Sequence, residues 1–502
     1  MSSSNLVSAM HSGEILRRCT NNGKIKFGHG MLLKTNEPLD MKDEDIALHE
    51  SLAPHCTVDG ACVYTHGSTH DVARDILARK HAEHDAFFIC DLRDIAKKVH
   101  LWKQQLPRIA PFYAIKACRD PVVVGLLNRL GVNFDCSNKG EISTVLKMEA
   151  SPDRIVYANT VKSIPDLEFA RQHGVRLMTF DCAEELAKIT DKRDRLLLRM
   201  EADEEGVEHS FNTKFGCTFS EVETVLQEAR NRECNVVGVA FHVGCAYKDP
   251  DIFARTIKRV KAVFDMAAAM GIHMTVLDIG GGFPGGLRNR DKFLKVCYSI
   301  RRATDLYFPE SSGVQIIAEP GQFFVTSGYS LVVQVLGKRS RKVVVDGVVQ
   351  LHQHVFVNES TDNCIMRYLY EFMDVKTWPL QEPLDRPHDA PTTVWGGTCN
   401  ALDCIEPERP FFDVVVGEWL LMDNIGAYSL SRASGFNGLP FPAVHYIVPQ
   451  DDVTIVQNIL NSSPLRSGFS QPEGVLKSAV LAQWRGQPAI RNRRVGVNDL
   501  RC

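Results

Sequence analysis

The sequence lacks several features that mark particular classes of protein. No stretch of its 502 residues is an apolar run of about 18, the length that a membrane-spanning helix requires. The formal net charge is only −3, and charged residues make up 24% of the chain, so no basic surface for nucleic acid is indicated. The opening residues, MSSSN, do not begin the charged and then apolar pattern of a secretory signal. We therefore expect a cytoplasmic protein with neither a membrane nor a nucleic-acid partner.

Cysteine pairs with the spacing of a zinc or redox site are also missing. The chain has 15 cysteines, but they are scattered, and no CxxC pair occurs. Several of them, such as Cys90, Cys118 and Cys136, lie in apolar runs, where a thiol packs as a small hydrophobic group. We expect reduced cysteines and no metal site.

The central part of the chain alternates short apolar strands with helical segments. Such repeated βα units imply parallel strands that are covered by helices. About eight units in roughly 240 residues is typical of a (β/α)8 barrel, an α/β fold. The predicted strands are residues 111–115, 133–136, 155–158, 177–181, 196–200, 236–242, 276–279 and 316–319.

After residue 325 strands follow strands, which indicates a second, antiparallel β-domain. Its predicted strands are residues 331–336, 342–349, 355–357, 393–395 and 419–423. Residues 1–55 lack periodicity and are rich in polar residues, so a flexible extension is predicted there. The predicted organisation is an extension at 1–55, a strand region at 56–90 that contributes to the β-domain, a barrel at 91–325, a β-domain with a catalytic cysteine loop at 326–450, and a polar tail at 451–502.

Lys116 ends the first barrel strand, PFYAIK. Burial removes water from a lysine amine and lowers its pKa, and a neutral amine can attack the aldehyde of pyridoxal phosphate. By itself, a lysine in this position more often marks the solvent end of a strand. Six further polar or glycine features end later barrel strands, and the functional residues of barrels lie at these ends. They are Asp135, Asn159, Arg199, His242, the run Gly280–Gly282, and Glu319.

Two of these strand-end features, and two residues of the predicted β-domain, suggest particular chemistry. Three glycines in a row let backbone N–H groups converge on an anion, and a buried carboxylate such as Glu319 can keep a pyridine nitrogen protonated. Cys399 lies in the glycine-rich loop WGGTC, and Tyr428 follows a flexible turn. On their own the last two are more often structural, although the pKa of such a thiol can be tuned for proton transfer.

Nine ordered segments between Phe87 and Val448, about three quarters of the chain, resemble the ornithine decarboxylase family. This family comprises pyridoxal-phosphate-dependent ornithine, diaminopimelate and arginine decarboxylases, and combines an alanine-racemase-like barrel with a β-domain (fold type III). The segments are PFYAIKAC, FDCSNKGEI, YANTVK, LLLRM, FHVG, LDIGGGFPG, AEPG, WGGTC and GAYSLSRASGFNG.

The resemblance implies a role for each matching residue. Lys116 would hold pyridoxal phosphate covalently, His242 would stack on its ring, and Glu319 would bond its ring nitrogen. Arg199 would lie close to Lys116 and the substrate. The remaining implied cofactor contacts are Asp135, Glu141, Cys245, Gly281, Gly282, Gly321, Gln322 and Tyr428. The implied substrate contacts are Tyr370, Glu371, Asn400 and Phe436.

The resemblance also implies a homodimer with shared active sites. Cys399 would come from the partner subunit and return a proton to the substrate carbon after CO2 leaves. Lys214 matches a lysine that pairs with a carboxylate across the interface. The reaction implied is decarboxylation of an amino acid, with ornithine and its product putrescine, a polyamine precursor, as the leading candidates.

Four positions depart from the family pattern. Gln322 stands in place of an arginine and Cys245 in place of a serine, and both touch the expected phosphate site. A charge-assisted hydrogen bond contributes about 1.5–3 kcal/mol, so losing the arginine would weaken cofactor binding by about ten- to a hundredfold. Glu371 and Asn400 each replace an aspartate, leaving one carboxylate for the distal amine. The segment 358–365 matches the family only loosely.

Two alternatives remain open. The loss of phosphate and substrate groups also fits a catalytically impaired regulator similar to the antizyme inhibitors. A racemase or a decarboxylase of altered specificity would use the same fold. Antizyme binding is not favoured, because residues 163–176 carry mixed charges where the antizyme-binding surface of the family is basic.

Overall fold

The computed structural model describes residues 52–461, except residues 59, 80–83, 204, 206–211, 246, 346 and 366–374. Most of the predicted extension at 1–55 and most of the predicted tail at 451–502 lie outside these residues, as do the predicted substrate contacts Tyr370 and Glu371. None of the helices in the described part of the chain has both the length and the apolar character needed to cross a bilayer.

Eight parallel strands form a closed barrel, which confirms the predicted (β/α)8 fold. Apolar residues dominate these strands, because their side chains are buried inside the barrel or beneath its helices. In spatial order each strand pairs with the next along the chain, and β11 closes on β4. The strands are β4 (Ile109–Ala114), β5 (Asn133–Cys136), β6 (Ile155–Tyr157), β7 (Leu177–Phe180), β8 (Arg195–Arg199), β9 (Val236–Ala240), β10 (Val276–Asp278) and β11 (Gln315–Ala318).

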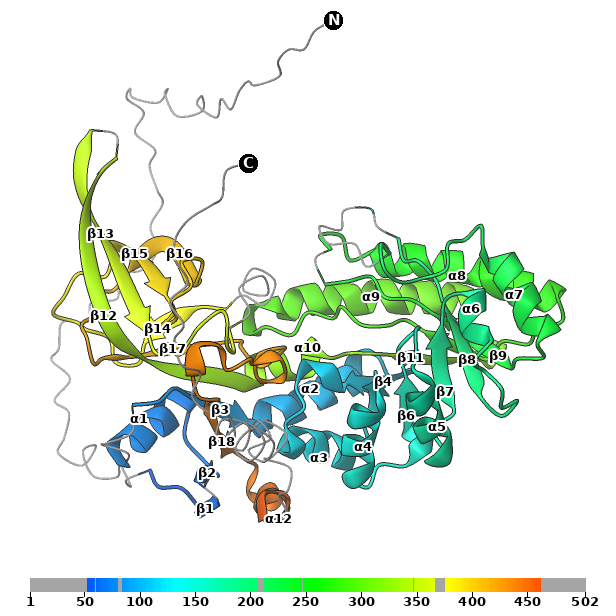
Figure 1. Ribbon diagram of the computed structural model, residues 1–502, viewed down its shortest axis with the longest axis horizontal. Helices are drawn as coiled ribbons and strands as arrows, with labels where there is room; N and C mark the ends of the chain where they lie inside the picture. Colours follow the sequence, from blue (N-terminus) through cyan, green and yellow to red (C-terminus); the bar gives the residue numbers. More distant parts are fainter. Residues whose placement is uncertain are drawn as a thin grey trace, which may run out of the picture. The chain divides into compact units, whose positions relative to one another are not determined.

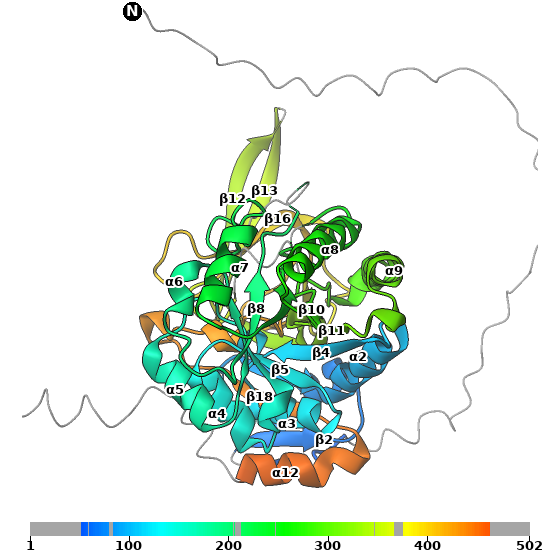
Figure 2. The same ribbon diagram turned by 90° about the vertical axis from the view of Figure 1, so that its right-hand side faces the viewer.

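Helices surround the barrel strands (Figure 2). They bury one apolar stripe each, for example Ile95, Val99 and Trp102 of α2. The helices are α2 (Leu92–Gln105), α3 (Pro121–Arg129), α4 (Lys139–Lys147), α5 (Ile164–Gln172), α6 (Ala183–Leu186), α7 (Val222–Asn231), α8 (Ile252–Ala269) and α9 (Arg290–Tyr307). Short 3-10 segments are η1 (Ile115–Ala117), η2 (Pro152–Arg154), η3 (Leu287–Asn289), η4 (Glu310–Ser312), η5 (Thr326–Gly328), η6 (Leu430–Arg432), η7 (Phe436–Gly438) and η8 (Gln450–Asp452).

The second sheet has ten strands in the described residues, in the order β1-β2-β18-β3-β12-β13-β15-β16, and β17 also pairs with β12 and carries β14 on its other side. The sheet is mostly antiparallel, as predicted, although β18 runs parallel to β2 and β3, and β13 runs parallel to β15. The strands are β1 (Cys56–Val58), β2 (Ala61–Tyr64), β3 (Phe87–Asp91), β12 (Tyr329–Val345), β13 (Val348–Val357), β14 (Thr377–Pro379), β15 (Ala390–Trp395), β16 (Cys404–Phe411), β17 (Trp419–Met422) and β18 (Ala443–Ile447).

Two elements differ from the expected ones. Strand β12 is a single long strand with a bulge between Val335 and Gly337, and it forms an extended hairpin with β13 (Figure 1). The predicted strands 331–336 and 342–349 therefore both fall in β12, and the second of them extends into the first two residues of β13. Helix α12 (Val453–Asn461) occupies the first part of the predicted polar tail, and its apolar side packs on α3, where Ile459 lies against Gly125. The remaining helices are α1 (Thr69–Arg79) and α10 (Gln322–Val325).

Asp120 links the barrel to the sheet. Its Oδ1 accepts a hydrogen bond from the Val122 backbone N–H at 2.8 Å and caps α3, whose first turn holds Pro121. Its Oδ2 accepts bonds from the hydroxyls of Tyr329 in β12 and Tyr446 in β18, at 2.8 and 3.0 Å. These buried bonds fix the sheet next to the strand end that carries Lys116.

Candidate active site

The carboxyl ends of the barrel strands bring most of the predicted barrel residues to one mouth. Lys116 lies in η1 directly after β4, and Asp135 lies in β5. Arg199 ends β8, His242 lies two residues after β9, and Glu319 directly follows β11. Because the eight strands are parallel and close into a ring, these ends face the same side of the barrel.

Lys116 forms an ion pair with Asp135, with Nζ and Oδ2 2.6 Å apart. The Asp135 side chain is fully buried, whereas that of Lys116 is 38% exposed at the mouth. Burial lowers the pKa of Lys116, but Asp135 and Glu319 outweigh it and hold that pKa above its usual value. The expected neutral lysine is therefore wrong for the protein without cofactor, because the sequence does not reveal these neighbouring carboxylates.

Glu319 has a second buried carboxylate, Asp278 of β10, as its partner. Burial and then Asp278 raise the pKa of Glu319 to about 8, and burial raises the pKa of Asp278 to about 7. The two side chains are hydrogen-bonded, so they hold a proton at neutral pH. Sequence reasoning missed Asp278, although a buried acid at the end of the strand before GGG was a usable signal.

His242 and the glycine run form a narrow cradle beside these acids. The Gly244 N–H donates to His242 Nδ1 at 2.9 Å, and burial holds the pKa of His242 well below its usual range. A Cβ atom on Gly281 would lie 2.7 Å from His242 Nε2 and 2.8 Å from the Glu319 carbonyl oxygen. Gly282 has a φ of +96°. The cradle therefore requires glycine at both positions.

Tyr428 comes from the sheet but reaches the Lys116 strand end. Its backbone N–H donates to the Ala117 carbonyl at 2.7 Å, and its φ of +57° is unusual for a bulky residue. Gly321 is also close, because a Cβ atom there would lie 3.1 Å from the Cβ atoms of Ala114 and Ala117. Tyr428 and Gly321 thus both lie beside the strand end that carries Lys116.

Two of the predicted cofactor contacts, Glu141 and Gln322, are hydrogen-bonded to other groups of the protein, and a third, Cys245, is half-buried. Glu141 is buried and accepts bonds from the Ser137 N–H and hydroxyl, at 2.7 and 2.6 Å. Gln322 is buried and donates through Nε2 to the Phe283 carbonyl at 3.2 Å, which supports the glycine loop from behind. Cys245 is half-buried, and burial raises the pKa of its thiol.

Arg199 lies over the ring of Phe215, 4.7 Å from the ring centroid. Burial lowers its pKa from the usual value, with Glu319 and other carboxylates opposing that effect. Lys214 is exposed and contacts the same ring at 4.9 Å. Asn159, the other predicted strand-end residue, donates to the Ser137 carbonyl at the rim of the barrel.

Cys399 lies on a different surface, which we call the Cys399 face: residues 358–365, 396–403 and 434–438. The thiol is exposed, and the Cys399 N–H donates to Asn437 Oδ1 at 3.0 Å. The neighbouring Phe436 is 47% exposed. Asn400 donates through Nδ2 to Asp362 Oδ2 at 2.7 Å. Sequence reasoning missed Asp362, because its segment departs from the family pattern.

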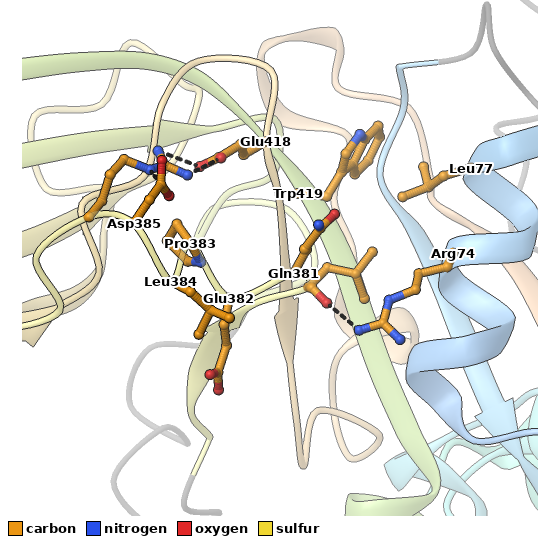
Figure 3. Close-up of a pocket in the computed structure, with 11 residues that line it drawn as sticks. Arg74, Leu77, Gln381, Glu382, Pro383, Leu384, Asp385, Glu418 and Trp419 are labelled. Carbon is orange, nitrogen blue, oxygen red and sulfur yellow. Dashed lines mark hydrogen bonds and ion pairs between the residues drawn. The ribbon is translucent and has the colours of Figure 1, made fainter. Parts of the chain in front are cut away.

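A separate pocket of about 610 Å³ lies between α1 and residues 380–386 (Figure 3). Arg74 donates to the Leu380 carbonyl at 3.1 Å, and Arg386 pairs with Glu418. Among the residues that the structure describes, none of the predicted site residues lines this pocket. We therefore do not connect it with the chemistry at the barrel mouth.

Comparisons with known proteins identify the family of this chain. The family model for the pyridoxal-binding domain of pyridoxal-dependent decarboxylases matches residues 92–326. Ornithine decarboxylase of Mus musculus is 36% identical over 393 residues, which cover 75% of this chain and 85% of that protein. Antizyme inhibitor 2 of Xenopus laevis is 36% identical over 374 residues, which cover 73% of this chain and 82% of that protein.

A solved structure shows the same fold. The arginine decarboxylase of Paramecium bursaria Chlorella virus, solved with bound agmatine, superimposes with a TM-score of 0.70 at 31% identity. The match covers 76% of this chain and all of the viral protein. With the closed barrel, the second sheet and the lysine at the barrel mouth, these matches show that the chain belongs to the ornithine decarboxylase family of pyridoxal-dependent decarboxylases.

Proposed function

We propose that this chain decarboxylates a basic amino acid, with ornithine as the first candidate and putrescine as its product. The observation that carries the proposal is the single barrel mouth that contains a lysine amine, a proton-holding pair of acids and a neutral histidine. Lys116, Glu319, Asp278 and His242 supply these groups. This is the set of groups that amino-acid decarboxylation on pyridoxal phosphate requires.

The donor set fits pyridoxal phosphate. One buried carboxylate oxygen, Asp135 Oδ1, has no hydrogen-bond partner within the described residues, so the mouth has unused capacity for a cationic ring. Because Gly281 and Gly282 carry no side chains, their backbone lies directly against His242 and Gly244. Lys116 would hold the aldehyde carbon, Glu319 the ring nitrogen, and the glycine run with Tyr428 the phosphate.

When bound, the cofactor supplies a protonated, conjugated ring that accepts the electron pair released as CO2 leaves. In the holoenzyme Glu319 would bond the ring nitrogen as a carboxylate and so maintain the proton on that nitrogen, whereas in the cofactor-free protein the pair of Glu319 and Asp278 holds a proton itself. His242, held neutral by burial and by its bond from Gly244, offers a flat face without a competing charge. Arg199 provides the nearby cation that orients the substrate carboxylate before it leaves.

We propose that Cys399 of the partner subunit returns the proton to the substrate carbon in a homodimer. The Cys399 thiol is exposed, as a group that acts on a neighbouring subunit must be. Within the described residues, the hydrogen bonds of its loop run to residues 358–363 and 437, and none reaches the barrel mouth. A partner molecule would supply the missing contact. Because an exposed catalytic thiol must stay reduced, we place the enzyme in the cytoplasm.

The test is an assay of CO2 release from ornithine, lysine, arginine and apolar amino acids by the purified holoenzyme. The proposal expects release from at least one basic amino acid and little from apolar ones. The second candidate is a regulatory protein, which Gln322 and Asn400 favour because they remove charges from the family pattern. A purified protein that neither binds pyridoxal phosphate nor releases CO2 from any of these substrates would support the regulator.

A further inference from the structure

Asp362 is a carboxylate on the Cys399 face to which the proposed reaction assigns no role. Asn400, which follows Cys399, donates to Asp362 Oδ2 through Nδ2 at 2.7 Å, and the hydroxyl oxygen of Thr398, which precedes Cys399, lies 3.4 Å from the same oxygen. The Asp362 carboxylate therefore lies against the two residues that flank the proposed proton donor. A charge held this close to Cys399 would contact the substrate on which Cys399 acts.

The other acid on this face, Asp403, has a structural role instead. It is 1% exposed, and its Oδ1 accepts bonds from the Thr361 N–H and hydroxyl, both at 2.8 Å. Its Oδ2 accepts bonds from the hydroxyls of Ser360 and Thr398, at 2.9 and 2.6 Å. Both oxygens of Asp403 are thus committed to holding the loops together, and neither is available to a ligand.

Asp362 differs from Asp403 both in its burial and in the number of its carboxylate oxygens that are hydrogen-bonded. Its side chain is only partly buried, and within the described ranges its carboxylate is hydrogen-bonded through Oδ2 and forms no ion pair. Its backbone is fixed on both sides, because its N–H donates to Ser360 Oγ at 2.9 Å and its carbonyl accepts from Ser434 Oγ. The result is a rigidly placed carboxylate with one oxygen free of described partners.

Asn400 donates to Asp362, and both polar atoms of the Asn400 side chain are hydrogen-bonded. Its Oδ1 accepts a bond from the Leu402 N–H at 2.9 Å, while its Nδ2 donates to Asp362. The carboxamide therefore has no free acceptor for a substrate amine. Its donor group therefore holds the Asp362 carboxylate in place.

We propose that Asp362, positioned by Asn400, binds the distal cationic group of the substrate. This inference rests on the proposed function and narrows its substrate class to amino acids with a second amine. A distal ammonium loses water when it enters the shared site and needs a charged partner there. The family pattern places an acid at position 400, and in this chain the acid at position 362 takes over that role.

The test compares Asp362→Asn with wild-type holoenzyme, using ornithine and lysine as substrates. Loss of one charge-assisted hydrogen bond, about 1.5–3 kcal/mol, predicts a KM about 10- to 100-fold higher, with a much smaller change in kcat. Norvaline, which has the carbon chain of ornithine without the distal amine, should inhibit both proteins equally. The matched control is Asp389→Asn, which removes an exposed acid of the same sheet and should leave the KM unchanged.

A second variant tests the same inference in case Asp362→Asn does not fold. Asn400→Ala keeps the Asp362 carboxylate but removes the hydrogen bond that positions it. We expect the KM for ornithine and lysine to rise several-fold, while the inhibition constant for norvaline stays unchanged. If wild-type enzyme releases no CO2 from any basic amino acid, the proposed function itself fails. If it does release CO2, and both Asp362→Asn and Asn400→Ala keep the wild-type KM for ornithine and lysine, this inference alone is overturned.

Discussion

The barrel mouth and the Cys399 face are built in opposite ways. At the mouth, Asp135 and Asp278 are fully buried on regular strands, and their neighbours carry strongly shifted pKa values. On the Cys399 face, the thiol is exposed, and loops hold it through side-chain bonds to backbone groups. The first region depends on exclusion of water, whereas the second depends on being open to another molecule.

This difference indicates how the two regions share one reaction. A dry, charged pocket fixes the protonation of a cofactor, because electrostatic effects are strong where water is excluded. A proton donor on exposed loops can meet a substrate bound elsewhere, provided that its loops are rigid. Substitutions should therefore separate the two regions: those at the mouth change cofactor binding, and those on the Cys399 face change turnover or substrate binding.

The largest expected effect is at Lys116. Lys116→Ala removes the only amine at the end of β4, so we expect loss of the visible absorbance band of the covalently bound cofactor and of all CO2 release. The matched control is Lys116→Arg, which retains a cation for Asp135 but no reactive amine. It should fold more stably than Lys116→Ala and be equally inactive. An intact absorbance band in either variant would contradict the assignment.

Cys399→Ala should have the next largest effect, but of a different kind. We expect turnover to fall by about 10²-fold or more, the usual contribution of a general acid, while the cofactor absorbance stays unchanged. Steady-state kinetics and absorbance spectra of the same preparation measure both quantities. Cys234→Ala, which removes a half-buried thiol of the barrel, is the control. Wild-type turnover in Cys399→Ala would show that the thiol is structural.

The acids of the mouth predict a pH dependence of stability without cofactor. The pKa of Glu319 is about 8 in the folded protein against an ordinary value of 4.5, so between these values the folded state keeps a proton that the unfolded state releases. The free energy of unfolding should therefore fall as the pH rises from about 5 to 8, by up to about 1.4 kcal/mol per pH unit for each such group. The Asp278 carboxyl acts in the same direction.

Denaturant titrations at several pH values measure this slope. Glu319→Gln should make it shallower, whereas Glu382→Gln, which changes an exposed acid of the sheet, should leave it as in the wild type. Lys116 adds no slope in this range, because its raised pKa keeps it charged in both states until higher pH. Equal slopes in the wild type and Glu319→Gln would contradict the protonated pair.

The smallest effect is expected at Gln322. Gln322→Arg restores the charge of the family pattern and should tighten pyridoxal phosphate binding by about tenfold, the lower end of a charge-assisted hydrogen bond. The gain is limited because Gln322 is buried and supports the glycine loop through Phe283. Equilibrium titration of the cofactor-free protein with pyridoxal phosphate measures this affinity. Weaker binding would mean that support of the loop matters more than the charge.

The barrel could be predicted from the sequence because its strands are buried on both sides and therefore appear as apolar runs. Once the strands were placed, Lys116, His242 and Glu319 followed from their positions at strand ends. Strand β12 was harder, because the stretch from Lys338 to Lys342 is exposed and rich in cations, and so resembles a break between strands. The apolar residues of α12 at helical spacing were a signal that the polar composition of the tail concealed.

The remaining features of the site depend on contacts between residues that are far apart in the sequence, and these contacts could not be predicted from it. The pKa of Lys116 is raised by carboxylates that follow it by 19 and 203 residues in the chain, Asp135 and Glu319. Asp278 lies within a quoted motif, but its importance comes from its bond to Glu319. Asp362 lies where the family pattern fails, and only the folded loops bring it to Asn400. These residues act through partners that are distant in sequence.

The central claim is that the barrel mouth of one subunit and the Cys399 face of another form one active site. The most direct measurement is CO2 release from a mixture of Lys116→Ala and Cys399→Ala proteins after subunit exchange. Each variant alone is nearly inactive, but a hybrid dimer would contain one site with both groups intact. Random exchange in a twofold dimer predicts recovery of about a quarter of the wild-type activity. Activity no greater than the sum of the two separate variants, despite demonstrated exchange, would contradict the claim.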